Sequence, residues 1–171
     1  MVLPIPALTQ VHVSERYGYT IRFPADWSSR QASQAWWPPD WKAEVSSEEP
    51  FDFIARGEEA PMVRAASAQL PEGLPSVNDW IDEYLTFSDV PGCAPSRETQ
   101  ELVRIDGAPG RLQDSCGQVE ATVVVEGRVY MFTLFLGDDQ VTNARELFDA
   151  FAETIDLSPE DAMESPSPSP S

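Results

Sequence analysis

Residues 128–136 read Arg-Val-Tyr-Met-Phe-Thr-Leu-Phe-Leu, and this run decides the fold. In a strand, alternate positions from Tyr130 to Leu136 would point to one side, and the positions between them are mostly apolar as well. A strand that is apolar on both faces must be covered on both faces. The link Glu126-Gly127 joins it to the apolar run 119–125, which is typical of a tight antiparallel hairpin. The sequence therefore predicts a doubly covered antiparallel sheet.

Further strands and two helices are predicted around this hairpin from alternating and helical apolar patterns. The predicted strands are 11–15 and 19–23 (a hairpin around Arg16-Tyr17-Gly18), 51–55, 62–70, 99–106 and 110–115. The predicted helices are 77–87, which follows the capping-box sequence Ser76-Val77-Asn78-Asp79, and 143–155. Helices on both faces would cover the sheet, so the fold class is α+β, an antiparallel sheet sandwiched between helices in an α/β/α arrangement.

The composition excludes several classes of partner. The chain has 171 residues, which predicts one domain, and 29 acidic against 11 basic residues give a formal net charge of −18. Nucleic acid is not an expected partner, because it is bound through Lys and Arg. Direct membrane insertion is not expected either, because no apolar run approaches the roughly 18 residues of a membrane span. A protein or a small neutral or cationic ligand is the expected partner.

Sequence motifs for catalysis are absent. The chain contains no Gly-x-Ser-x-Gly, His-Glu-x-x-His, Cys-x-x-Cys, Gly-x-Gly-x-x-Gly or P-loop motif, so no cofactor or metal is expected. The single histidine, His12, is the one imidazole that could act as a general base beside a carboxylate. It lies between Val11 and Val13, so it is expected to point away from them, toward solvent or the helix layer, as an ordinary strand histidine.

Acidic residues crowd the stretch from 44 to 59. They are Glu44, Glu48, Glu49, Asp52, Glu58 and Glu59. The stretch lacks the alternating oxygen ligands and sharp glycine turn of a calcium loop. It is expected to form a solvated acidic surface.

Cys93 and Cys116 both lie among turn-forming polar residues rather than in apolar runs. An even count of two such cysteines predicts one disulfide bond. The alternative is two unrelated free thiols.

Three tryptophans, Trp36, Trp37 and Trp41, lie in a loop interrupted by Pro38 and Pro39. Such a cluster either folds back as a lid over the sheet or forms a binding surface. The site hypothesis is that at least two of the three are exposed and form one patch or the wall of a groove, where they contact the partner.

The stretch from Tyr19 to Trp27, Tyr-Thr-Ile-Arg-Phe-Pro-Ala-Asp-Trp, resembles the opening strand of the PsbP/Mog1-like superfamily. The closing helix with Thr154-Ile155-Asp156-Leu157 is similar to the end of that domain. The resemblance covers one domain over 9–159, with an N-terminal extension at 1–8 and a disordered Ser-Pro tail at 160–171. It implies an α/β/α sandwich, and members of the superfamily are mostly binding or assembly modules. The chain most resembles the uncharacterised bacterial exported members.

Three functions are compatible with these features. The first is a non-catalytic binding or assembly module that acts outside the cytoplasm, with the leader absent from this chain. The second is a cytoplasmic interaction protein of the Mog1 kind, and the third is a small enzyme that uses His12.

Overall fold

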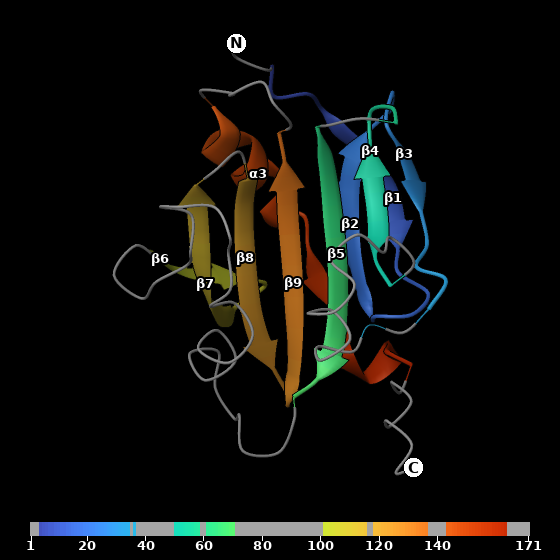
Figure 1. The fold of residues 1–171 in the computed structure, drawn as a ribbon, viewed down its shortest axis with the longest axis vertical. Coiled ribbons are helices and arrows are strands. Elements are labelled where there is room, and N and C mark those ends of the chain that lie inside the picture. Colours follow the sequence, from blue (N-terminus) through green and yellow to red (C-terminus); the bar gives the residue numbers. More distant parts are fainter. Residues whose placement is uncertain are drawn as a thin grey trace.

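The computed structural model describes residues 4–34, 36, 50–58, 61–70, 101–115, 118–136 and 143–163. These residues form two antiparallel sheets, one α-helix and one turn of 3-10 helix. The larger sheet has seven strands in the order β3-β4-β5-β9-β8-β7-β6 (Figure 1). Its strands are β3 (Ser28–Arg30), β4 (Asp52–Ala55), β5 (Met62–Gln69), β6 (Glu101–Ile105), β7 (Ala108–Ser115), β8 (Gln118–Val125) and β9 (Arg128–Phe135).

Strand β9 occupies the centre of the larger sheet, between β5 and β8. All of its residues except Phe135 are buried, on both faces. The turn into it has positive φ at Glu126 (49°) and Gly127 (74°), as a two-residue type I′ turn requires. The predicted interior strand and its hairpin are confirmed.

The turn between β6 and β7 is shorter than expected. Asp106 and Gly107, with φ of 49° and 78°, make the turn alone, and Ala108 and Pro109 already pair in β7. The short strand β3 is not predicted by the sequence, because three exposed residues carry no hydrophobic period.

The smaller sheet consists of β1 (Leu8–Val13), β2 (Tyr19–Pro24) and β10 (Asp156–Leu157), in the order β1-β2-β10. Strand β2 buries alternate side chains against the larger sheet, as the expected hairpin pattern requires. The Tyr19 ring lies edge-on to the rings of Tyr130 and Phe132, with centroids 6.4 and 5.2 Å apart. The smaller sheet therefore forms a second layer, which packs against the larger sheet.

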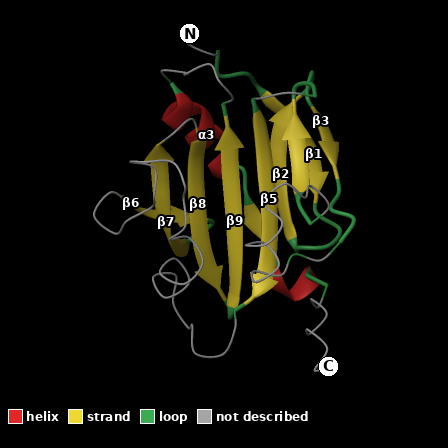
Figure 2. Ribbon diagram, viewed as in Figure 1, coloured by secondary structure: helices red, strands yellow, loops and turns green. Residues whose placement is uncertain are grey.

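Helix α3 (Ala144–Ala152) lies on the same face of the larger sheet as the smaller sheet (Figure 2). Its apolar side buries Leu147, Phe148 and Phe151, and the Phe151 ring lies 5.4 Å from that of Trp27. Beyond β10 lies the 3-10 turn η1 (Pro159–Asp161), and the Met163 amide that follows it donates a hydrogen bond to the Arg16 carbonyl in the β1–β2 hairpin. Trp27 is thus a core residue.

The expectation of a sheet sandwiched between helices is corrected for the part of the chain that the structure describes. One layer is shared by α3 and a three-stranded sheet, because the apolar face of β2 covers the larger sheet as a helix would. The other expected helix, 77–87, lies outside the described residues. Among those residues, no helix has the length and apolar character needed to cross a bilayer.

Candidate functional site

His12 points away from Val11 and Val13, as expected, but into the core rather than to solvent. It is 2% exposed, whereas the two valines are 50% and 58% exposed. Its Nε2 lies 3.2 Å from Oδ2 of Asp52, which is also buried. Of the two expected directions, solvent is wrong, because the face of β1 opposite the valines packs toward the edge of the larger sheet.

Asp52 is the centre of a buried polar network. The Tyr19 hydroxyl donates to its Oδ2 at 2.7 Å, and the Ala32 amide donates to its Oδ1 at 2.7 Å. Burial by itself raises the pKa of Asp52, but hydrogen bonds from His12, Ser14, Tyr19 and Ala32 outweigh it and hold the pKa below its usual range. Asp52 is therefore a buried carboxylate and is not part of a solvated acidic surface.

This network joins β1, β2 and β4. Burial, and then the charge of Asp52, raises the pKa of Tyr19 well above its usual value, so its hydroxyl remains a donor. A general base needs a group within reach of a substrate proton. His12, Tyr19 and Asp52 are each at most 2% exposed and are bonded to one another, so their contacts hold the two sheets together.

The structure changes the tryptophan hypothesis. Trp36 is 1% exposed, and its ring lies 6.2 Å from that of Phe51. This residue is a core residue and not part of a binding surface, because its ring packs against an aromatic residue next to β4. Trp37 and Trp41 lie outside the described residues, as do Cys93 and Cys116.

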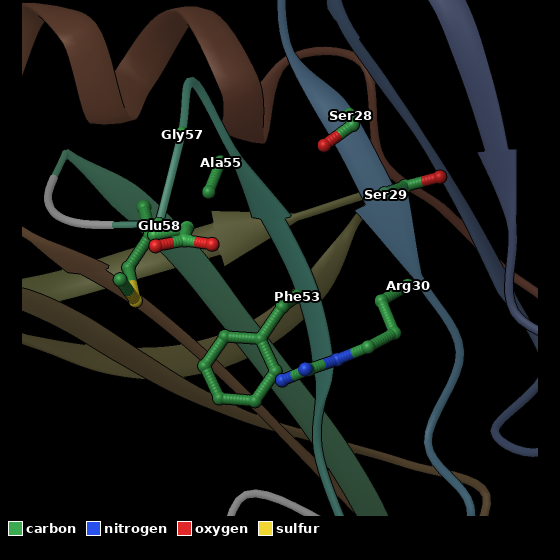
Figure 3. Close-up of a pocket in the computed structure, with 8 residues that line it drawn as sticks. Ser28, Ser29, Arg30, Phe53, Ala55, Gly57 and Glu58 are labelled. Atoms are coloured by element: carbon green, nitrogen blue, oxygen red, sulfur yellow. The ribbon is translucent and has the colours of Figure 1, made fainter.

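A cleft of about 390 Å³ lies beside β3, at the edge of the larger sheet (Figure 3). Strands β3, β4 and β5 place its walls on one face of the sheet, because Arg30 is opposite Phe53 and Ala55 is opposite Met62. The described residues that line it are Ser28, Ser29, Arg30, Phe53, Ala55, Gly57, Glu58 and Met62.

The cleft carries both signs of charge over an aromatic surface. The guanidinium carbon of Arg30 lies 4.9 Å from the centre of the Phe53 ring, and Glu58 is exposed on the turn that follows β4. Figure 3 shows the Ser28 hydroxyl directed toward Ala55. In this view the Glu58 carboxylate lies below Ala55. Such an arrangement can bind a polar ligand that has an apolar part.

A second arginine lies next to the cleft on the same face. Arg64 of β5 is directly opposite Phe53, and its guanidinium carbon lies 4.2 Å from the Phe51 ring centre and 4.7 Å from the Phe135 ring centre. Burial lowers the pKa of Arg64, and the charge of Glu120 opposes this effect. The guanidinium remains charged, because an arginine does not lose its proton in proteins.

Glu120 follows two strands further along the same row. Its Oε2 accepts a hydrogen bond of 2.9 Å from Thr133 Oγ1. Burial raises the pKa of Glu120, although Arg64 and Thr133 act in the opposite direction. Within the described ranges, no three side chains of His, Cys, Asp or Glu come together as a metal site.

The sequence comparisons and the structure comparisons differ in outcome. No family model and no curated protein matches the sequence. The solution structure of cyanobacterial PsbP (CyanoP) from Synechocystis matches with a TM-score of 0.54 at 14% identity, over 88% of this chain and 93% of CyanoP. The fold is that of PsbP. A crystal structure from Bacteroides thetaiotaomicron also matches the chain, with a TM-score of 0.52 at 8% identity over 88% of this chain.

The PsbP-like fold agrees with the resemblance seen in the stretch from Tyr19 to Trp27, which is confirmed at the level of architecture. The chain spans about half of the Bacteroides protein, of which it covers 49%. Identities of 8% and 14% show a shared fold and no more.

The cleft and its neighbouring arginine were not predicted from the sequence. Residues 28–30 and 53–58 are distant in the chain, and only the pairing of β3 with β4 brings them together. Arg64 did carry a signal, since it is the single charged residue in the strand Met-Val-Arg-Ala-Ala-Ser-Ala-Gln. A lone arginine in such a strand indicates a specific role for its charge.

Proposed function

We propose that the protein is a non-catalytic binding or assembly module, and that a protein segment or a small ligand occupies the cleft beside β3. The observation that carries the proposal is the cleft itself. Its volume of about 390 Å³ is in the range of ligand sites, and Arg30 and Glu58 place opposite charges beside the Phe53 ring.

The charges favour a neutral or cationic ligand. At long range the net charge of −18 repels anions and attracts cations. In the cleft the charges of Arg30 and Glu58 balance, which suits a zwitterion such as an amino acid or a peptide with free termini.

Two further observations support binding rather than catalysis. The PsbP-like fold agrees with the resemblance to a superfamily of mostly binding and assembly modules. The one histidine of the chain is buried and bonded to Asp52, where it joins strands of the two sheets. The proposal therefore assigns His12 a structural role.

Blocking the cleft tests the proposal. An added side chain at Gly57 meets no atom within 4 Å of its Cβ, so Gly57→Tyr should fill the cleft without disturbing the fold. Leu102→Tyr is the matched control, because Leu102 is 75% exposed on β6, at the other edge of the sheet. The probe is a pool of random tripeptides with free termini, added to ¹⁵N-labelled protein and followed by NMR.

Amide shifts that saturate in β3 and β4, and that Gly57→Tyr abolishes but Leu102→Tyr does not, would support the proposal. The absence of any shift in these strands, or shifts that Gly57→Tyr leaves unchanged, would contradict it.

We further propose that the protein acts outside the cytoplasm. The support is the pair Cys93 and Cys116 in turn-rich sequence, together with the Ser-Pro repeat at 165–171. Iodoacetamide treatment of the denatured, unreduced protein isolated from its native cells should add no mass. Alkylation of both thiols would contradict this assignment.

A further inference from the structure

Arg64 lies on the same face of the sheet as two residues that line the cleft, Phe53 and Met62. It is opposite Phe53, which is in turn opposite Arg30, so the three side chains form a row across one face of β5, β4 and β3. Residues directly opposite in an antiparallel pair have Cβ atoms about 5 Å apart. Met62, two residues before Arg64 on the same face, lines the cleft as well. A ligand of two or three residues, each up to ~3.5 Å long, can therefore span from Glu58 toward Arg64.

The guanidinium of Arg64 has a fixed orientation. It lies near two aromatic rings, with distances of 4.2 Å to the Phe51 centre and 4.7 Å to the Phe135 centre. Stacking on aromatic rings holds the guanidinium plane and leaves its N–H groups to point outward along its edge. Little side-chain entropy then remains to be lost when an acceptor binds.

The Nε–H of Arg64 has no acceptor in the described part of the chain. Its Nε is shielded from solvent and makes no hydrogen bond, and no described carboxylate forms an ion pair with it. Glu120 acts on it through charge alone and already accepts a hydrogen bond from Thr133. Buried donors in folded proteins are almost always satisfied, so an acceptor is missing here.

We infer that Arg64 recognises the carboxylate of a zwitterionic ligand, an amino acid or a peptide C-terminus, whose remainder occupies the cleft. This inference rests on the proposed function and names its ligand class. The planar guanidinium and a carboxylate form two parallel N–H···O hydrogen bonds, which an ammonium group cannot reproduce. Glu58, which lines the cleft, accepts the amine of the same ligand.

Three peptide pools test the inference on the wild-type protein without any substitution. They are random tripeptides with free termini, the same pool with C-terminal amides, and the same pool with acetylated N-termini. Dissociation constants come from NMR shifts in β3 and β4. Both pools that keep the carboxylate should bind at least tenfold more tightly than the amide pool, because only they supply the acceptor.

Substitutions then assign the effect to one residue. Arg64→Met should abolish the preference for the free carboxylate, and Arg64→Lys should retain a weaker preference while keeping the charge. Arg30→Met should leave the preference in place. Equal affinity for the acid and amide pools in the wild-type protein would overturn the inference and leave the proposed function standing.

Loss of the preference in Arg30→Met but not in Arg64→Met or Arg64→Lys would also overturn the inference. Binding of none of the three pools would overturn the inference and the proposed function together.

Discussion

At Asp52, four hydrogen-bond donors converge on one buried carboxylate. They come from His12, Ser14, Tyr19 and the Ala32 amide, so the network links β1 and β2 with β4 and with the chain that follows β3. A buried carboxylate is stable only when its oxygens are hydrogen-bonded in this way. The largest polar contribution to the packing of the two sheets is expected from this residue.

Asp52→Asn should lower the free energy of unfolding by about 2–4 kcal/mol at pH 7, because the amide loses the charge and turns a donor toward donors. The folded-state pKa of Asp52 lies below its usual value. The stabilisation by the carboxylate is therefore complete above the unfolded-state pKa of about 4 and is lost as the pH falls through the folded-state pKa. Urea unfolding at a series of pH values from 7 down to 3 should show the free energies of unfolding of the variant and the wild type approaching one another as the pH falls.

Asp149→Asn provides the surface control for this experiment. Asp149 accepts a hydrogen bond of 2.8 Å from Arg145 on α3, and its side chain is 48% exposed. Exposed pairs of this kind contribute less than about 1 kcal/mol. A loss at Asp52 no larger than the loss at Asp149, or a pH-independent difference, would contradict the role assigned to the buried network.

At the scale of elements, β9 and α3 each contribute a buried aromatic side chain to the core. Phe132 and Phe151 are both buried. Phe132→Ala and Phe151→Ala should each lower the free energy of unfolding by about 3–5 kcal/mol, because each leaves a cavity in a packed core. Leu102→Ala, at a position 75% exposed, should change it by less than about 0.5 kcal/mol. Chemical denaturation measures all three, and a small loss at either phenylalanine would place that ring outside the core.

The β1–β2 hairpin and the C-terminal segment are joined at Gly18. Its φ is 71°, its carbonyl accepts a hydrogen bond of 2.7 Å from the Ser158 amide, and a Cβ there would lie 2.3 Å from the Ser158 oxygen. Gly107 has a similar φ of 78° but no atom within 4 Å of a Cβ. Of these two glycines, only Gly18 is a position where a side chain would meet both a strained backbone and a steric clash.

Gly107→Ala should lower the free energy of unfolding by about 1–2 kcal/mol, which is the cost of a left-handed conformation alone. Gly18→Ala should lower it by about 3–4 kcal/mol, because the C-terminal segment must also move. Thermal unfolding of the two variants side by side gives the comparison. Equal losses would show that the contact with Ser158 contributes nothing.

At the scale of the whole molecule, the predicted bond between Cys93 and Cys116 would tie two distant parts of the chain. Cys116 directly follows β7, and Cys93 precedes β6. A disulfide that closes the loop between these two cysteines should stabilise the fold by roughly 3 kcal/mol according to the chain-entropy model. Urea unfolding with and without reductant should show this difference, and the double variant Cys93→Ser/Cys116→Ser should behave as the reduced protein. An unchanged unfolding midpoint on reduction would contradict the bond.

Much of the fold could be predicted from local patterns. Both faces of 128–136 are apolar, which predicts an interior strand. Glu126-Gly127 between two apolar runs predicts a tight turn, and the structure has positive φ at both residues. Helix α3 follows from apolar residues at helical spacing. These features depend on residues close together in the chain, which is why the sequence predicts them.

Other features depend on contacts between distant segments. The alternation around His12 shows two faces of a strand but not which of them meets the core; that depends on how the smaller sheet stacks on the larger. In an acidic stretch, Asp52 is indistinguishable from its neighbours until β4 carries it beneath His12 and Tyr19.

The candidate site depends wholly on tertiary structure. Strand β3 has three exposed residues and no alternating hydrophobic pattern. Only its register with β4 places Arg30 over Phe53. The same sheet sets Arg64 beside two aromatic rings that lie on either side of it in the chain. A binding site made of strands that are distant in sequence exists only after the sheet has formed, because pairing between strands, rather than any local pattern, brings its charges and rings together.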